Sequence, residues 1–432
     1  MKIQEFVVKL DKIVNGGQAI ADLILGNGEQ KKVFIWGGLP GETVRFCITK
    51  KRAGIYEGVV TEVLARAPER VAACDNSSYI STSPWQVFDY EFELKQKAEL
   101  IKQAFAAQKI EIATPEVKTD HQQYGYRNKM EFAWWWDKDR ERLDLAVYRR
   151  GSKGKIAVSG VSLAREEINQ AAIRIRELLN NLKIEARKLK TLLVRCNHDG
   201  VVVAQLYVTS NDLQINELQF AELQLQGFEL ILSDPRSPAS VITQRLQTFG
   251  KMRLSDRLLE KKFVYPAESF FQINLSVYQL ALRSIESQLL PNKPIVDLYS
   301  GVGTIGLSIT ENSELTLVEI NQAAVEEMKT NIKTLNMTHA RAVLAASENA
   351  VDYITHDCQL IVDPPRAGLH QRVIKQILEQ QPERIIYLSC NVVTQARDVA
   401  LLTEKYSIKS VLGFNFFPRT PHIENLVVLD LK

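Results

Sequence analysis

A cysteine and a carboxylate in the last part of the chain could together carry out covalent chemistry. The apolar run Arg384–Ser389 predicts a buried strand that delivers Cys390 to its carboxyl end, the edge at which an open α/β sheet faces its ligands. Further on, a proline-braced segment ends in Glu424. A thiol can act as a nucleophile and a carboxylate as a proton acceptor. Each residue alone also has an ordinary explanation, a buried small hydrophobe or a solvated acid.

A glycine-rich turn precedes this pair. The segment Ile295–Gly306 indicates an apolar strand, a turn containing Gly301 and then a helix. Glycine lets the backbone approach a ligand closely, and the amino end of a helix favours polar or negative groups. Glu319 ends the next predicted strand, where a carboxylate can accept hydrogen bonds from ribose hydroxyls. These features predict an adenosine cofactor but do not distinguish a dinucleotide from another kind.

Two further features favour S-adenosylmethionine. The predicted strand Leu360–Asp363 ends in an acid followed by two prolines, which stiffen the turn and hold Asp363 at the mouth of the crevice. A simple strand-end turn is the alternative. The segments Ser407–Phe416 and Asn425–Leu431 predict a closing antiparallel hairpin, which methyltransferases of this class usually carry and dehydrogenases usually lack.

A thiol, a base and a sulfonium donor together fit methylation of uracil at C5. That carbon is a poor nucleophile, but addition of a thiolate at C6 turns the ring into an enolate whose C5 can accept a methyl group. A base must then remove the C5 proton so that the thiol can be eliminated. Cys390, Glu424 and the Gly301 turn would supply the three parts.

The rest of the chain predicts three domains that position these groups. Residues 1–66 contain five short strand-like runs, typical of a small oligonucleotide-binding β-barrel. Residues 67–264 are strand-rich with two helices, which favours an α+β domain with a mixed or antiparallel sheet. Residues 265–432 alternate strand and helix, which predicts a doubly wound, Rossmann-like α/β domain. A linker helix is expected over Tyr90–Gln108 and would pack on the last domain.

The chain has a net charge of only +3, so cations that hold a phosphate backbone must be gathered locally. Lys50, Lys51 and Arg52 form one such group, either a solvated hairpin tip or a phosphate contact. The triple Trp134–Trp136 offers a base-stacking surface. Alternation along a strand would send Trp135 to one face and its neighbours to the other, so part of the triple is expected in the core.

Composition narrows the location and partners. The sequence contains no apolar run of about 18 residues, so we expect no membrane helix. The amino-terminal segment also lacks the layout of a signal peptide. The five cysteines are scattered without a CxxC pair, which indicates reduced thiols rather than disulfides. We therefore expect a cytoplasmic protein without membrane contact, and no obligatory protein partner is evident.

Taken together, these motifs resemble the RNA 5-methyluridine methyltransferase family, whose members modify transfer RNA or large-subunit ribosomal RNA. The likeness covers nearly the full chain, and the amino-terminal Leu39–Glu42 resembles the TRAM domain of the 23S ribosomal RNA branch. The other matching segments are Tyr126–Lys129, Ser269–Asn274, Asp297–Gly303, Asp363–Arg366, Ser389–Asn391 and His422–Glu424.

The resemblance implies that Cys390 is the nucleophile, that Glu424 removes the C5 proton and that the cofactor is S-adenosylmethionine. No metal ligand is implied. The TRAM-like and central domains would hold RNA and present one splayed-out base, with 23S ribosomal RNA favoured over transfer RNA. The expected cofactor-binding residues are Gln272, Tyr299, Gly301, Thr304, Glu319, Ser347 and Asp363.

One departure concerns an iron–sulfur cluster that many ribosomal members hold with four cysteines. Cys74 matches the first ligand position, whereas Ile80, Ser83 and approximately Val161 stand at the others. Because one thiolate cannot hold such a cluster, we predict none here.

Several alternatives stay open. A transfer RNA 5-methyluridine methyltransferase would share the whole site. One major group of 5-methylcytidine enzymes places a cysteine where this chain has Arg366, and base-amine methyltransferases need no thiol. From another class, a non-catalytic RNA-binding protein could retain a methyltransferase shell, and failure to bind S-adenosylmethionine would favour it.

Overall fold

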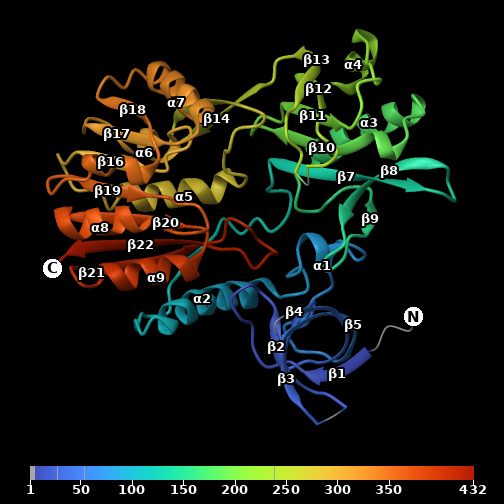
Figure 1. The fold of residues 1–432 in the computed structure, drawn as a ribbon, viewed down its shortest axis with the longest axis horizontal. Helices are drawn as coiled ribbons and strands as arrows, with labels where there is room; N and C mark the ends of the chain where they lie inside the picture. Colours follow the sequence, from blue (N-terminus) through green and yellow to red (C-terminus); the bar gives the residue numbers. More distant parts are fainter. Residues whose placement is uncertain (1–4, 27, 53, 238) are drawn as a thin grey trace. The chain divides into compact units, whose positions relative to one another are not determined.

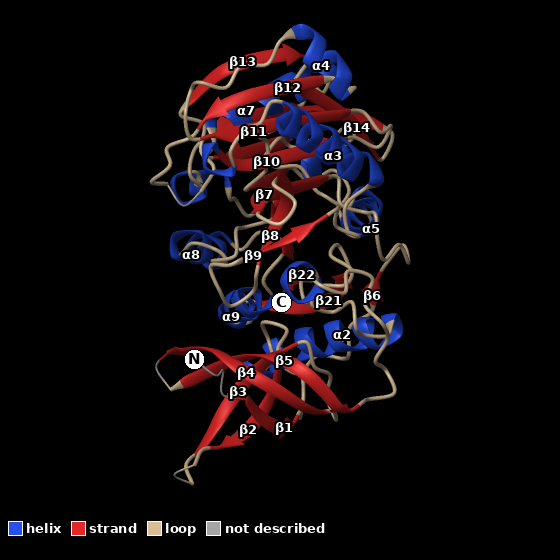
Figure 2. Ribbon diagram, turned by 90° about the vertical axis from the view of Figure 1, so that its right-hand side faces the viewer, coloured by secondary structure: helices blue, strands red, loops and turns tan. Residues whose placement is uncertain are grey.

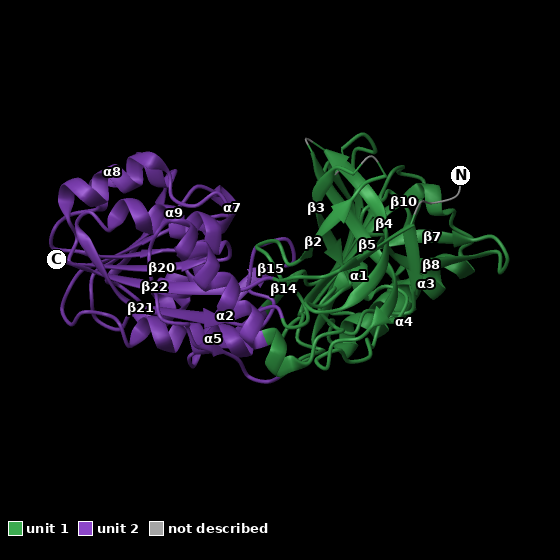
Figure 3. Ribbon diagram, turned by 90° about the horizontal axis from the view of Figure 1, so that it is seen from below, with its two compact units in different colours: residues 1–93, 122–254, 418–421 green, residues 94–121, 255–417, 422–432 purple. Residues whose placement is uncertain are grey.

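The computed structural model describes residues 5–26, 28–52, 54–237 and 239–432. The chain divides into two compact units, coloured separately in Figure 3. The first unit comprises Met1–Glu93, Gln122–Leu254 and Pro418–Pro421, and the second comprises Leu94–His121, Ser255–Phe417 and His422–Lys432. Most of the first two predicted domains thus lies in one compact unit, but Leu94–His121 and residues 255–264 of the second lie in the other unit. The three-domain division itself stays a prediction.

All five strand-like runs of the amino-terminal segment form strands, which make a curled sheet (Figure 2). The order is β1-β4-β5-β3-β2, and only β3 and β5 run parallel. Apolar residues such as Val33, Ile35 and Phe46 are fully buried, so the alternation of the strands gives this sheet one core-facing side. The bounds are β1 Glu5–Lys9, β2 Ala19–Ile24, β3 Gln30–Trp36, β4 Thr43–Arg52 and β5 Ile55–Ala65.

A buried carboxylate fixes the turn before β4. Glu42 is fully buried and accepts hydrogen bonds from the backbone N–H groups of Leu39 at 2.8 Å and Ala67 at 3.3 Å. Arg70 donates to both of its oxygens, at 2.5 and 2.8 Å. A carboxylate removed from water in this way depends on the donors that face it, so the segment Leu39–Glu42 is held by electrostatics as well as by packing.

The strand-rich middle segment forms a seven-stranded sheet of order β13-β12-β11-β10-β7-β8-β9. Only β11 and β12 run parallel, which confirms the predicted mixed sheet. The bounds are β7 Lys129–Asp137, β8 Arg142–Tyr148, β9 Lys155–Val158, β10 Leu189–Cys196, β11 Val202–Val208, β12 Gly227–Leu232 and β13 Gln244–Gly250, with helices α1 Tyr79–Thr82, α3 Glu166–Asn181 and α4 Glu217–Leu223.

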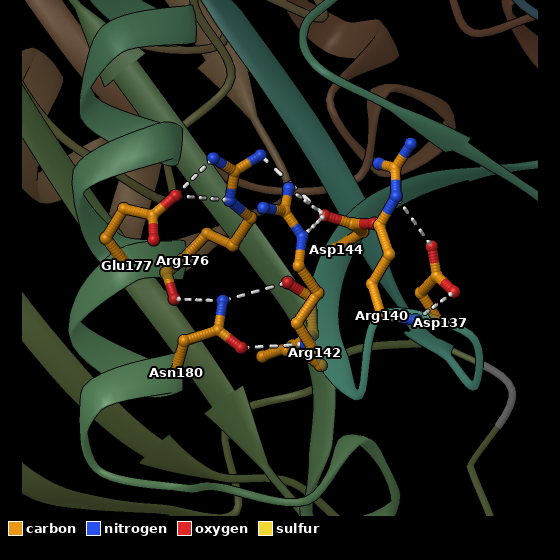
Figure 4. Close-up of polar contacts among 8 residues, drawn as sticks. Asp137, Arg140, Arg142, Asp144, Arg176, Glu177 and Asn180 are labelled. Carbon is orange, nitrogen blue, oxygen red and sulfur yellow. Dashed lines mark hydrogen bonds and ion pairs between the residues drawn. The ribbon is translucent and has the colours of Figure 1, made fainter.

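Helix α3 is fastened to β8 by polar groups as well as by its apolar face (Figure 4). Asn180 exchanges two hydrogen bonds with the backbone of Leu143, at 2.7 and 2.9 Å. Arg142 and Arg176 both approach the buried carboxylate of Asp144, at 2.8 and 3.9 Å. The cations at this edge are therefore bound to neighbouring acids and hold the helix in place.

The tryptophan triple is divided differently from strict alternation. Trp134 lies in the core, as expected for part of the triple, but Trp135 and Trp136 are 44% and 41% exposed. The reason is that β7 pairs with β10 only through Lys129–Phe132, and farther along it pairs with β8 alone. The end of β7 belongs to a two-stranded ribbon with too little packing around it to bury Trp136.

A short carboxyl-terminal segment completes the first unit. Arg419 is 5% exposed and donates from Nη1 to the carbonyl of Phe88 at 2.6 Å. The backbone N–H of Arg419 donates to the Glu93 carboxylate at 3.0 Å, and the Tyr126 hydroxyl donates to the carbonyl of Pro418 at 3.0 Å. Residues 418–421 are thus an integral part of this unit.

The second unit contains an eight-stranded sheet of order β18-β17-β16-β19-β20-β22-β21-β6. Figure 1 shows its strands side by side. The first five run parallel, and β22 is inserted antiparallel between β20 and β21. This confirms the predicted Rossmann-like fold and its closing hairpin. The strand bounds are β16 Ile295–Leu298, β17 Leu315–Glu319, β18 Ala340–Leu344, β19 Gln359–Val362, β20 Arg384–Ser389, β21 Tyr406–Phe414, β22 Glu424–Leu431 and β6 Val117–Lys118.

The central strands of this sheet are buried on both faces, because helices cover the faces of a parallel sheet. From the expected linker helix, Ile101, Ala104 and Phe105 pack in the same core. Across the described ranges no helix has the length and hydropathy to span a bilayer. The bounds are α2 Tyr90–Ala107, α5 Leu275–Glu286, α6 Thr304–Ile309, α7 Gln322–Thr334, α8 Gln371–Gln380 and α9 Val392–Leu402. The hairpin β14 Arg253–Leu258 with β15 Lys261–Pro266 lies before α5 in the chain.

Replacing Arg70 tests the buried ion pair with Glu42. We expect Arg70→Leu to lower the free energy of unfolding by about 3–5 kcal/mol, because it leaves the Glu42 carboxylate buried without its cation. Glu42→Gln in the same chain should restore part of that loss. Thermal unfolding of both variants and of the unaltered protein measures the loss and its recovery. Equal midpoints for Arg70→Leu and the unaltered protein would contradict this role.

Candidate active site

Strand pairing brings Cys390 and Glu424 together. Strands β20 and β22 run antiparallel, and their register ends with Ser389 opposite Asn425. Cys390 is the next residue on one strand and Glu424 the preceding residue on the other, so the two lie at the same edge of the sheet. Cys390 is half-buried, and Glu424 is 4% exposed. The sequence predicted both residues, and the structure places them as neighbours.

Polar side chains fix the turn that carries Cys390. Asn391 caps α9 by accepting from the backbone N–H of Val393, and its Nδ2 donates to the carbonyl of Arg366 at 2.8 Å. Gln395, on α9, donates to the carbonyl of Asn425 at 3.0 Å, and Asn425 Nδ2 in turn donates to Gln395 Oε1 at 2.6 Å. The loop after Asp363 and the starts of α9 and β22 are thereby tied to one another.

The acidic groups at this edge are poorly solvated. Burial, followed by the nearby charges of Glu424 and Asp363, raises the pKa of Cys390 to about 11, while Arg366 opposes the shift. Burial also raises the pKa of Asp363 to about 7. Burial and then Asp363 raise the pKa of Glu424 well above its usual value, again against Arg366. Cys390 and Glu424 thus face the same cation, Arg366, and both lie near Asp363. Burial disfavours charging all three acidic groups together.

The glycine-rich turn lies at the ends of β16 and β17. Gly301 has a φ of 58°, and a side chain added there would meet no atom within 4 Å, so its backbone faces open space. The N–H of Gly301 donates to Glu319 Oε2 at 3.0 Å, and the N–H of Asn321 donates to Oε1 at 2.8 Å. These bonds hold the Glu319 carboxylate against the turn, next to that open space.

The remaining predicted cofactor residues all lie in the second unit. Thr304 begins α6, and its hydroxyl is 2.8 Å from that of Tyr278. Tyr299 has a φ of 63°, and burial raises the pKa of its hydroxyl, while hydrogen bonds from the His370 backbone and the Ser347 side chain oppose the shift. Tyr299 and Ser347 are therefore in contact. Gln272 is buried in the segment before α5.

A cavity of about 590 Å³ lies beside Tyr299. It lies between α8, α9 and the loop that follows Asp363, and its lining includes Pro365, His370 and Leu401. Of the residues predicted from the sequence, Tyr299 alone is among those that line it.

Sequence reasoning assigned no role to two charged residues at this edge. Arg366 follows the two prolines and faces Cys390, whose pKa it lowers. Asp297 is fully buried, and its Oδ2 accepts from the N–H of Gly306 at 3.0 Å. Burial raises the pKa of Asp297 to about 8. Both lie inside motifs described above, Asp363–Arg366 and Asp297–Gly303. The spacing of these residues along the chain does not predict their contacts.

A family model and related sequences match most or nearly all of this chain. The family model described as tRNA (Uracil-5-)-methyltransferase matches residues 89–432. A Bacillus anthracis protein described as an uncharacterized RNA methyltransferase is 27% identical over 455 residues, covering 99% of this chain and 97% of that protein. A Clostridium tetani protein with the same description is 28% identical and covers 94% of each chain.

A solved structure shares the fold of nearly the whole chain. The crystal structure of Pyrococcus abyssi tRNA (uracil-54, C5)-methyltransferase in complex with S-adenosyl-L-homocysteine matches with a TM-score of 0.79. The match covers 99% of this chain and 100% of that chain at 22% sequence identity.

The electrostatic environment of Cys390 can be tested by alkylation. In a Cys47→Ser/Cys74→Ser background, the iodoacetamide reaction of Cys390 should rise with pH toward the pKa of about 11, far above the value of about 8.5 for a free thiol. Arg366→Gln should slow the reaction at a fixed mildly alkaline pH, because it removes the cation that stabilises the thiolate. Glu424→Gln should accelerate it. Mass spectrometry of the Cys390 peptide gives each rate, and faster alkylation in Arg366→Gln would refute this account.

Proposed function

The chain belongs to the tRNA (uracil-5-)-methyltransferase family, and from this premise we propose that it methylates C5 of a uridine in RNA with Cys390 as nucleophile and Glu424 as base. It is an RNA methyltransferase that uses S-adenosylmethionine. The observation that carries the proposed roles is the register of β20 and β22, which sets the thiol beside the carboxylate. A sheet edge with a nucleophile and a base has the parts that this reaction needs.

The residues around Gly301 fit the cofactor. The open space above the Gly301 backbone allows close approach of a ligand, and Glu319 is already oriented there by two backbone donors. Its remaining lone pairs suit ribose hydroxyls. Tyr299 and Ser347 would border the same ligand. When bound, S-adenosylmethionine supplies a methyl group on a positively charged sulfur.

Cys390 begins the proposed reaction as a thiolate. Its raised pKa leaves few thiolates at neutral pH, so Arg366 is the group that favours the charged form. Sulfur adds to C6 of uracil, a carbon–sulfur bond forms, and the π electrons move into an enolate. C5 of the enolate then takes the methyl group of S-adenosylmethionine, whose methyl–sulfur bond breaks to leave a neutral thioether. Glu424 removes the C5 proton, the sulfur–C6 bond breaks, and the thiolate returns with the double bond restored.

The shifted pKa of Glu424 suits a base. Because burial and Asp363 both raise it, the carboxylate holds a proton more strongly than a solvated one. It must be deprotonated when C5 carries both hydrogen and methyl. Burial also raises the pKa of Asp363 to about 7, so the charge that this carboxyl group places near Glu424 changes close to neutrality.

We propose large-subunit ribosomal RNA as the substrate, on the strength of the TRAM-like segment Leu39–Glu42 and the strand order around it. Transfer RNA is the second candidate, which the family description and the Pyrococcus abyssi enzyme favour. The cytoplasmic location and the absence of an iron–sulfur cluster stay predictions from the sequence.

Nucleoside mass spectrometry on cells with and without this gene tests the reaction and the substrate together. We expect 5-methyluridine to disappear from large-subunit ribosomal RNA and to stay unchanged in transfer RNA. Loss from transfer RNA alone would select the second candidate. Unchanged 5-methyluridine in both pools, with another methylated base missing, would exclude the uridine reaction.

Two substitutions test the roles of the thiol and the carboxylate. Cys390→Ala should abolish turnover and leave the affinity for S-adenosylmethionine nearly unchanged, since it removes only the nucleophile. Glu424→Gln should accumulate a covalent protein–RNA adduct, visible as a shifted band in denaturing gels, because elimination needs the base. Cys74→Ala, at an exposed thiol, serves as the control. Normal turnover by Glu424→Gln would remove Glu424 from the mechanism.

A further inference from the structure

Two basic turns that are far apart in the sequence lie side by side in the first unit. One is the end of β4, which leads toward β5 and carries Lys50, Lys51 and Arg52. The other joins β8 to β9 and has the sequence Arg-Arg-Gly-Ser-Lys-Gly-Lys over residues 149–155. We call residues 49–52 and 148–155 the paired turns. Only the first was predicted from the sequence, as either a solvated hairpin tip or a phosphate contact.

Contacts with the first sheet and with α1 hold the second turn in place. Gly151 lies so close to Thr49 that an added Cβ would be 2.9 Å from the threonine Cβ, and its φ is +74°. The Arg150 guanidinium lies 4.1 Å from the centroid of the Trp36 ring. The Arg150 backbone N–H donates to Ser81 Oγ at 3.0 Å, and its Nε donates to the carbonyl of Ile80 at 2.5 Å. Gly151 therefore forms the contact between the two turns, and Arg150 anchors the second turn to Trp36 and α1.

The other cations of the paired turns are available to a ligand. Lys50 pairs with Glu57 at 3.0 Å. Lys51, Arg52, Arg149 and Lys153 are exposed, and within the described part of the chain none of these four takes part in an ion pair. For a chain whose net charge is only +3, four unneutralised cations in one place form a strongly positive surface.

An aromatic ring stands among these charges. Tyr148 ends β8, is 62% exposed, and has the Lys155 ammonium 5.5 Å from its ring centroid. Positive charge that follows a phosphate chain, combined with an exposed aromatic face, is the pattern of surfaces that bind unpaired nucleotides. An acidic protein surface would match the charge but would make no use of the exposed ring.

We propose that the paired turns bind the sugar–phosphate backbone of single-stranded RNA outside the target uridine, with Tyr148 stacking on one base. This rests on the proposed function, because it takes RNA as the substrate. Lys51, Arg52, Arg149 and Lys153 contact phosphates, and the close contact of Gly151 with Thr49 holds the two turns side by side. Phosphate contacts carry affinity without reading sequence, so the surface retains the RNA while the site in the second unit selects the base.

Charge reversal tests the surface in the full-length protein. Arg149→Glu/Lys153→Glu is compared with Arg372→Glu/Lys375→Glu on α8, which changes the net charge equally at two exposed residues. The probe is a labelled oligouridine of about 20 nucleotides, followed by fluorescence anisotropy over a series of potassium chloride concentrations. We expect the first variant to bind about tenfold more weakly at low salt. Its slope of log affinity against log salt should be shallower by about 1.4, that is, about 0.7 for each phosphate that the variant no longer neutralises. Equal losses in the two variants, or no loss in either, would overturn the proposal.

Two uncharged changes separate geometry from charge. Gly151→Val should weaken oligouridine binding several-fold by forcing the turns apart at Thr49. Tyr148→Ala should weaken it with an unchanged salt slope, because stacking releases no ions. Calorimetry with S-adenosylmethionine should give the same affinity in every variant. Normal binding by Gly151→Val and Tyr148→Ala would overturn the role of the Gly151 contact and the stacking role.

The outcome is separable from that of the proposed function. If the unaltered protein binds oligouridine through the paired turns but methylates no uridine, the reaction assignment fails and the surface stands. If it forms 5-methyluridine and the reversed variant binds as tightly as the unaltered protein, the surface fails and the reaction stands.

Discussion

The antiparallel pairing of β20 with β22 is the constraint on which the site depends. Both strands are buried along nearly all their length, so their register is specified by packing on two faces. A slip of one residue would turn every side chain of β22 to the opposite face. Glu424 would then point away from Cys390. The catalytic neighbourhood is thus set by the core of the sheet, and the loop that precedes β22 has only to reach it.

The same burial that fixes the register makes the site electrostatically demanding. Cys390, Asp363 and Glu424 all have raised pKa values because water is largely excluded, and Arg366 is a cation that faces Cys390 and Glu424. Such an edge holds protons rather than charges until a substrate rearranges it. That suits a reaction in which one proton leaves a thiol at the start and another is collected from carbon at the end.

Much of this could be predicted from the sequence because it is local. An apolar run that stops at Cys390, a glycine turn at Gly301 and an acid at Glu319 are features of single strands and their ends. Contacts between distant segments could not be predicted in this way. The cation beside Cys390 and the exposure of Trp136 depend on which strands become neighbours. The docking of Gly151 on Thr49 depends on two sheets meeting, for which spacing along the chain gives no signal.

The segment Pro418–Pro421 has a consequence for how the protein is made. It lies between two strands of the second unit, yet it supplies Arg419 to the interior of the first. A ribosome synthesises these four residues after every other segment of the first unit. Until then that unit lacks the buried guanidinium and backbone donor that meet Phe88 and Glu93. The first unit therefore completes its folding only near the end of translation, together with the second. Because each unit consists of several segments of the chain, neither can be excised as one continuous piece.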